Sequence, residues 1–157
     1  MKMTAEERGF HRKVAAQAFN RSWDYLDMKK RTPDDDRELL HLAHASRYHW
    51  GLVGEPKNLA VGDWLLSRAY GEIGEPRLAL RFAQSSLATC KRAKLGNIVH
   101  TANEAMARAY ALSGDFVEAR GYLDVARGQL KRLKLDKEDR KIFLGQIEQT
   151  GRLIPGS

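Results

Sequence analysis

A spacing of forty residues relates two parts of this chain. Three residues recur at that distance: Tyr70, Gly74 and Ala79 return as Tyr110, Gly114 and Ala119. Each Tyr also ends an identical Arg-Ala-Tyr triplet. A fixed period of this size is typical of stacked supersecondary units, each of which buries its apolar face against a neighbour because it cannot do so alone. The sequence therefore predicts a repeat architecture.

All-helical structure is predicted throughout. Apolar residues recur at three and four positions, and Pro and Gly stand mostly at the ends of these segments. The same Gly-Glu-Pro turn occurs at 54–56 and 74–76. At 74–76 Gly suits the left-handed residue after a helix, and Pro suits the first turn of the next. Seven helices are expected, at about 5–30, 32–53, 56–73, 76–95, 97–112, 115–133 and 137–150.

A single domain at residues 1–150 is expected, followed by a flexible tail at 151–157. The composition, 43% apolar and 30% charged, is that of a folded soluble protein. No apolar run approaches the roughly eighteen residues of a membrane helix, and the first residues are too charged for a secretory signal. These features predict a cytoplasmic protein outside the membrane. The single cysteine, Cys90, is expected to be a small core residue rather than a reactive thiol.

The residue spacing within each unit resembles the tetratricopeptide pattern (TPR), in which small and aromatic residues let two antiparallel helices pack closely across a Gly turn. The matching residues are Leu66, Tyr70, Gly74, Ala79, Ala83 and Leu87, and again Met106, Tyr110, Gly114, Ala119, Leu123 and Ala126. A weaker first copy comprises Trp23, Leu26, Leu39, Ala43 and Ser46. In that copy Lys30 and Asp34 depart from the Tyr and Gly of the pattern.

This resemblance implies a right-handed α-α superhelix of about three helical hairpins, with the last helix as a C-terminal cap. The forty-residue period is longer than the family's usual length of about thirty-four, which implies longer helices. The segment at 43–50 also resembles uncharacterised bacterial repeat proteins, a likeness that implies no activity.

In the tetratricopeptide pattern the first helix of each pair lines a concave groove that binds a partner. The resemblance places these residues in the groove: Asp24, Met28, Trp64, Arg68, Glu104 and Arg108. Arg68 and Arg108 are the leading candidates, because a guanidinium group is a planar fork of donors suited to carboxylates. The alternative for both is ion pairing inside the scaffold with Glu72 or Glu104. Trp64 is either an anchor for a partner or a core residue.

Three histidines raise a separate hypothesis. His41 and His44 share a face of the second expected helix and His49 follows, so a metal or small-ligand site is an alternative. The chain has no His-Glu-x-x-His arrangement, Gly-rich phosphate loop or nucleophile elbow. We therefore predict no metal, no cofactor and no enzymatic activity.

The net charge of +7 gathers in the second half of the chain, at 91–94 and 127–141. A basic surface attracts nucleic acid or an acidic partner, but Lys and Arg near helix C-termini also complement the helix dipole. Interleaved aromatic residues are lacking, so nucleic acid is the less favoured partner. We expect a protein-interaction scaffold or adaptor that receives a peptide or helix in its groove, with a homodimer as a further option. The alternative is a regulatory protein that binds nucleic acid, a small ligand or a metal.

Overall fold

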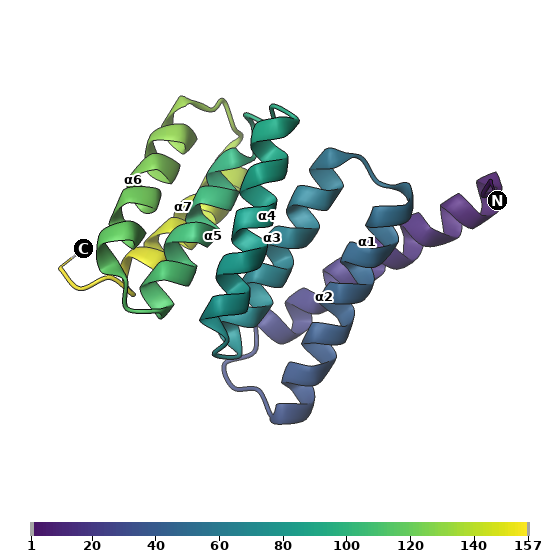
Figure 1. Ribbon diagram of the computed structural model, residues 1–157, viewed down its shortest axis with the longest axis horizontal. Helices are drawn as coiled ribbons and strands as arrows, with labels where there is room; N and C mark the ends of the chain where they lie inside the picture. Colours follow the sequence, from purple (N-terminus) through teal and green to yellow (C-terminus); the bar gives the residue numbers. More distant parts are fainter. Residues whose placement is uncertain (1, 157) are drawn as a thin grey trace.

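In the computed structural model, which describes residues 2–156, the chain folds into helices joined by short turns. They are α1 (Ala5–Leu26), α2 (Pro33–Val53), α3 (Pro56–Glu72), α4 (Pro76–Arg92), α5 (Val99–Leu112), α6 (Phe116–Arg132) and α7 (Lys137–Gly151). No strand occurs in this part of the chain, so the predicted all-α class is confirmed. The closest packing is within the pairs α1–α2, α3–α4 and α5–α6, and α1 and α6 lie toward opposite ends of the molecule (Figure 1).

The two glycines of the forty-residue repeat have the same backbone conformation. Gly74 has φ +84° and Gly114 has φ +81°, in the left-handed region that glycine adopts without steric cost. The residue after each Gly donates its amide to the carbonyl oxygen of Tyr70 or Tyr110, at 2.9 Å in both turns. The repetition in the sequence is therefore a repetition of turn geometry.

The two repeated tyrosines also have equivalent ring partners. Tyr70 stacks on Phe82, with ring centroids 5.5 Å apart and planes 3° from parallel. Tyr110 stacks on Tyr122, at 5.7 Å and 16°. Aromatic pairs of this kind contribute about 0.5–1.5 kcal/mol beyond the area they bury. Each stack therefore joins the two helices of a pair near their shared turn.

Buried serines bring paired helices close together. The Ser46 hydroxyl in α2 donates to the carbonyl of Ala15 in α1 at 2.9 Å, and the Ser86 hydroxyl in α4 donates to the carbonyl of Ala60 in α3 at 2.7 Å. Ser46 and Ser86 are forty residues apart. A small side chain at this position lets the backbones approach, and the bond to a neighbouring carbonyl satisfies its hydroxyl.

The end of α4 differs from the prediction. The helix ends at Arg92 because Lys94 takes a left-handed conformation, with φ +54°, and the Leu95 amide donates to the Cys90 carbonyl at 2.9 Å. Gly96, which we expected to end this helix, lies beyond the turn. A Lys in this conformation carries a steric cost that sequence patterns assign to Gly.

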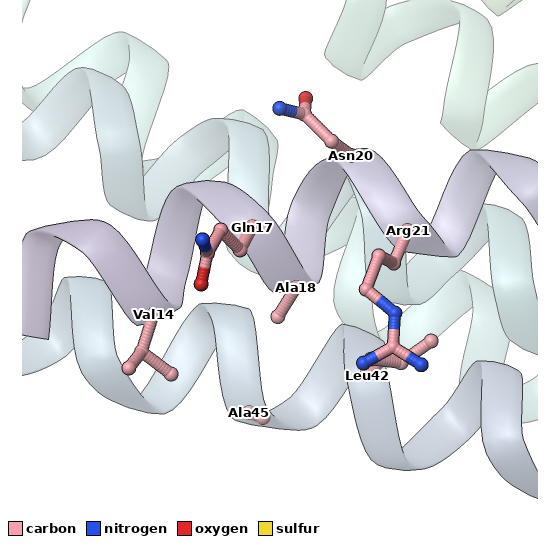
Figure 2. A pocket seen from close by; sticks show the side chains of 7 residues that line it. All are labelled: Val14, Gln17, Ala18, Asn20, Arg21, Leu42 and Ala45. Atoms are coloured by element: carbon pink, nitrogen blue, oxygen red, sulfur yellow. The ribbon is translucent and has the colours of Figure 1, made fainter.

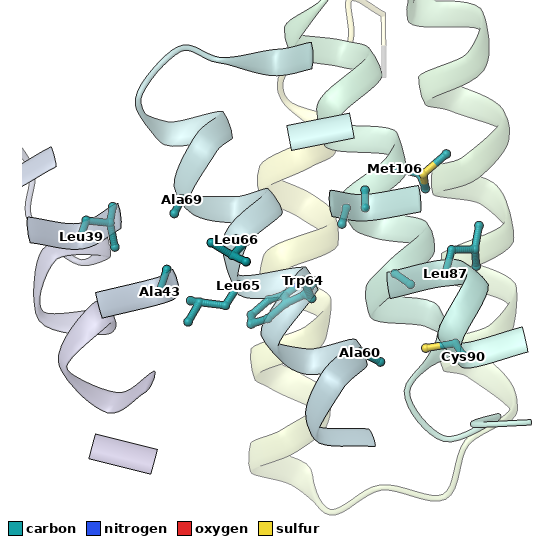
Figure 3. Close-up of a cluster of buried hydrophobic side chains, with 13 residues drawn as sticks. Leu39, Ala43, Ala60, Trp64, Leu65, Leu66, Ala69, Leu87, Cys90 and Met106 are labelled. Carbon is teal, nitrogen blue, oxygen red and sulfur yellow. The ribbon is translucent and has the colours of Figure 1, made fainter. Parts of the chain in front are cut away.

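The main core cluster joins α2, α3, α4 and α5. Figure 3 shows its side chains, with Leu65 of α3 pointing toward Ala43 of α2. Cys90 belongs to this cluster, and burial raises the pKa of its thiol to about 11. Its predicted role as a small core residue is confirmed. None of the helices within residues 2–156 is long and apolar enough to cross a bilayer.

The last helix, α7, packs against α5 and α6 and passes behind both in Figure 1. Ile147 of α7 and Ile154 beyond it belong to a second core cluster with residues of α5 and α6. The Arg120 guanidinium also donates to the Pro155 carbonyl at 2.6 Å. Part of the segment that we expected to be a flexible tail is therefore packed against the domain, because Ile154 supplies an apolar side chain that is only 2% exposed.

Candidate functional site

Four helices form a row in which each contacts the next: α1, α3, α5 and α7. Three of the residues expected in a groove come together where α3 and α5 of this row face α7. They are Arg68 in α3 and Glu104 and Arg108 in α5, and two of them hydrogen-bond to side chains of α7. The surface expected to receive a partner is thus partly occupied by the chain's own last helix.

Glu104 and Arg108 are bound within the scaffold. Glu104 is 2% exposed and accepts a 2.5 Å hydrogen bond from the Thr150 hydroxyl of α7. Arg108 places Nε 3.5 Å from the Glu104 carboxylate and Nη1 3.6 Å from the Glu72 carboxylate. Glu72 also pairs with Arg31 at 3.4 Å. Arg108 thus forms ion pairs inside the scaffold, as the alternative to partner binding expected, and it does so with both Glu72 and Glu104.

Arg68 has no such partner. The residue is 8% exposed, and no carboxylate of residues 2–156 lies within ion-pairing distance of it. Its Nη2 donates to the amide oxygen of Gln149 at 2.9 Å, and its Cζ lies 5.4 Å from the centroid of the Trp23 ring. Its Nε and Nη1 are buried without a hydrogen-bond partner. Donors left unsatisfied in this way are costly, and most native structures avoid them.

The charged form of Arg68 is therefore destabilised in the folded protein. Burial, followed by the nearby positive charge of Arg108, lowers the pKa of Arg68 to about 10, and Glu104, Glu72 and Asp27 offset only part of this effect. The guanidinium remains protonated at neutral pH. It is therefore a desolvated cation whose charge the protein does not fully balance.

Two cavities meet at Arg68. One has a volume of about 280 Å³ and extends toward Arg108 and Leu153, and the other has a volume of about 500 Å³ and runs along α7 past Ile142 and Gly145. Both are lined by Trp23, Asp27, Arg68 and Gln149. We call the two cavities together the α1–α7 cleft. The four shared residues supply an aromatic ring, an exposed carboxylate, a buried cation and an exposed amide.

The other expected groove residues lie outside this cleft. Trp64 is 7% exposed and belongs to the main core, with its ring 5.8 Å from that of Trp23, so the core alternative is the observed one. Asp24 is exposed on α1, and Met28 is exposed beyond its end. Met28 is forty residues before Arg68, but it does not take the equivalent position on a helix. The reason is that α1 ends at Leu26, four residues before the expected end.

The three expected histidines do not converge. His41 is exposed and lies 3.7 Å from the Glu38 carboxylate. His44 lies with Nε2 2.8 Å from the Tyr70 hydroxyl, and His49 lies with Nδ1 2.7 Å from Nδ1 of His11. Burial, and then the neighbouring His41 or His11, lowers the pKa of His44 and of His49. Within residues 2–156 no three His, Cys, Asp or Glu side chains are grouped closely enough to hold a metal ion.

Part of the basic excess has a structural role. Lys131 and Arg132 occupy the last turn of α6, where positive charge complements the helix dipole. Arg140 of α7 donates from Nη1 to the Leu130 carbonyl at 3.2 Å and from Nη2 to the Leu133 carbonyl. The Leu130 carbonyl also accepts the Leu133 amide at 3.2 Å, so Arg140 adds a second donor to it and a donor to the carbonyl of Leu133 at the end of α6. Arg140 therefore attaches α7 to α6.

A larger cavity of about 560 Å³ lies between α1 and α2. Figure 2 shows Val14, Gln17 and Arg21 projecting from α1 toward α2 around it. Arg21 is the only charged side chain in its lining, and it is exposed. This cavity lacks the buried, unbalanced charge of the α1–α7 cleft and is the weaker candidate.

Sequence patterns alone did not reveal the contribution of Gln149 and Thr150. The last helix was expected to cover an apolar face, and nothing in its spacing shows which polar residues meet Arg68 and Glu104. One signal was present: Arg108 has Glu104 four residues before it, whereas Arg68 has Trp64 at that position. Comparison with protein-family models, with curated proteins and with solved structures finds no match for this chain.

Proposed function

We propose that this chain is a tetratricopeptide-like protein-interaction module whose α1–α7 cleft binds a peptide segment of a partner protein. The repeated Gly74 and Gly114 turns, the repeated ring stacks and the pairwise packing support the likeness. In this proposal the three helix pairs form a right-handed superhelix, and α7 lies along its concave face.

The observation that carries the proposal is the buried guanidinium of Arg68 beside Trp23 in the cleft. Arg and Trp are the residue types most often found at the energetic centre of protein interfaces. Around this centre α7 and the residue after it present charged residues of both signs, including Lys141, Glu148 and Arg152. A desolvated centre with a polar rim is the usual anatomy of an interface.

The remaining space favours an extended segment over a helix. A helix with its side chains is about 10–12 Å across, and α7 already occupies that position against α5. The cavities of about 280 and 500 Å³ that remain suit a few residues of extended chain. The occupant is therefore an extended segment that crosses Arg68.

A selection of randomised displayed peptides on the immobilised protein tests this function. Gly145 lines the cleft and Gly121 lines a cavity on α6, and a Cβ atom at either position meets no heavy atom within 4 Å. Gly145→Trp should fill the cleft, whereas Gly121→Trp adds the same ring elsewhere. Selected peptides should bind G145W at least about tenfold more weakly, a loss of about 1.4 kcal/mol, and bind G121W like the wild type.

Circular dichroism would confirm that both variants remain helical. Selection that yields no peptide sensitive to G145W, while G145W is folded, would contradict the proposed function.

A further inference from the structure

Arg68 and Arg108 hold the same position in successive repeats but differ in their partners. Each begins an Arg-Ala-Tyr triplet, and both line the α1–α7 cleft. Arg108 has Glu104 one helical turn earlier and pairs with it, whereas the residue one turn before Arg68 is Trp64. The repeat thus keeps the arginine and omits its carboxylate.

Gln149 takes the place that a carboxylate would occupy. Its amide oxygen accepts one hydrogen bond from Nη2 of Arg68, and Nε and Nη1 remain without partners. A carboxylate offers two oxygens to the guanidinium fork in charge-assisted bonds about twice as strong as neutral ones. Gln149 is exposed, so its side chain can move aside without disturbing the core.

The position of Arg68 within the cleft indicates whether the incoming carboxylate belongs to a side chain or to the end of a peptide. Arg68 lines both cavities, so a bound chain continues on either side of it. A chain end would leave one of the two cavities unfilled. The geometry therefore favours an acidic side chain within the segment over a terminal carboxylate.

We propose that Arg68 is a carboxylate-binding subsite, in which an Asp or Glu side chain within the bound peptide displaces Gln149 and pairs with the guanidinium. This inference rests on the proposed peptide-binding function, whose ligand it makes acidic. The lowered pKa of Arg68 is consistent with a cation that lacks a counter-charge. Asp27 lines the cleft as well and opposes an incoming carboxylate.

Sodium succinate tests the subsite independently of any peptide. The readout is the Nε–H signal of Arg68 in nuclear magnetic resonance spectra, with sodium chloride at equal ionic strength as the reference. The wild type should show a saturable shift. Gln149→Glu places a tethered carboxylate on the guanidinium and should abolish the shift. Gln146→Glu lines the same cleft, adds the same charge without replacing the bond to Arg68, and should retain the shift.

No saturable shift in the wild type, or an equal shift in Q149E, would overturn the subsite. Asp27→Asn addresses the possibility that Asp27 is the true partner of Arg68. Under our proposal D27N binds succinate several-fold more tightly and unfolds at the same urea concentration as the wild type. If D27N were less stable than the wild type and bound succinate equally well, Asp27 would be the charge partner of Arg68 and the subsite would be overturned.

The selected peptides separate failure of this inference from failure of the proposed function. Replacement of their Asp or Glu by Asn or Gln should weaken binding to the wild type at least about tenfold, with little effect on binding to Q149E. Cleft-dependent peptides without an internal acidic residue would overturn the subsite and leave peptide binding intact. Peptides whose only carboxylate is C-terminal, binding equally well, would also overturn the assignment to a side chain.

Discussion

The hydroxyl of Thr150 donates a 2.5 Å hydrogen bond to the carboxylate of Glu104, and both side chains are buried. This contact joins α7 to α5. Oε2 of Glu104 has no hydrogen-bond partner. The carboxylate therefore depends on Thr150 and on the ion pair with Arg108.

Replacement of Thr150 by Val tests the importance of this bond. T150V is close to the same size and removes only the donor, which leaves a buried carboxylate less satisfied. The free energy of unfolding should fall by about 1–3 kcal/mol, measured by urea denaturation. T150S keeps the hydroxyl and gives the separate cost of the methyl group. Equal stability of T150V and the wild type would contradict this role.

His100 should make the stability depend on pH. Burial lowers the pKa of His100 from 6.5 to about 4, against the opposing effects of Glu104 and of a hydrogen bond from the His100 ring to the Asn97 backbone. The unfolded chain therefore gains a proton at His100 before the folded chain does. Stability is fully present above pH 6.5 and is lost as the pH falls toward 4, by up to roughly 3 kcal/mol.

The variant His100→Gln lacks this titration. Urea midpoints measured between pH 7 and pH 4 should fall less steeply for H100Q than for the wild type. His100 packs edge-on against Phe143 of α7, at 4.7 Å between ring centroids, so the titrating group lies at a contact that attaches α7. Parallel pH profiles for the two proteins would show that His100 is not the group responsible.

Alanine should be destabilising at two of the glycines with positive φ, Gly74 and Gly114. Gly74→Ala and Gly114→Ala place a Cβ in the left-handed region and should each lower the free energy of unfolding by about 1 kcal/mol or more. Gly128, inside α6, has space around its Cβ position, so Gly128→Ala should raise stability by up to about 1 kcal/mol. Thermal unfolding of the three variants checks the contrast in sign.

Cys90 should react slowly in the folded protein. Its pKa of about 11, against an ordinary 9, reduces the thiolate fraction by about a hundredfold, and burial blocks access as well. A thiol reagent at pH 8 should modify the folded chain at least about a hundredfold more slowly than the chain in denaturant. Equal rates would show that this part of the core opens readily.

The helices and their turns could be predicted because they depend on local chemistry. Gly74 and Gly114 end their helices as expected, and Thr32 caps α2 through its side chain. The end of α4 could not be predicted, because the exposed Lys94 takes the conformation that local preference assigns to Gly96, and the next residue, Leu95, packs against the main core. Local signals thus fix a turn only where no packing force competes with them.

The candidate site was only partly predictable for a related reason. The repeat period placed Arg68 and Arg108 in equivalent positions, and the structure brings both to the α1–α7 cleft. Their different surroundings arise from contacts distant in sequence: Gln149 lies eighty-one residues from Arg68. The forty-residue repeat predicts only contacts that occur in both units. Helix α7 has no counterpart in the repeat, so its contacts with Arg68 and Glu104 could not be predicted from it.

The close approach of Trp23 and Trp64 has an optical consequence. Indole rings with centroids 5.8 Å apart and planes inclined by 36° couple electronically, which produces a paired signal of opposite signs in circular dichroism. One of these rings lies in the core of α3 and the other lines the α1–α7 cleft. The two rings are thus a built-in chromophore pair, whose spectrum should change if α1 shifts on α3 or if a molecule binds beside Trp23.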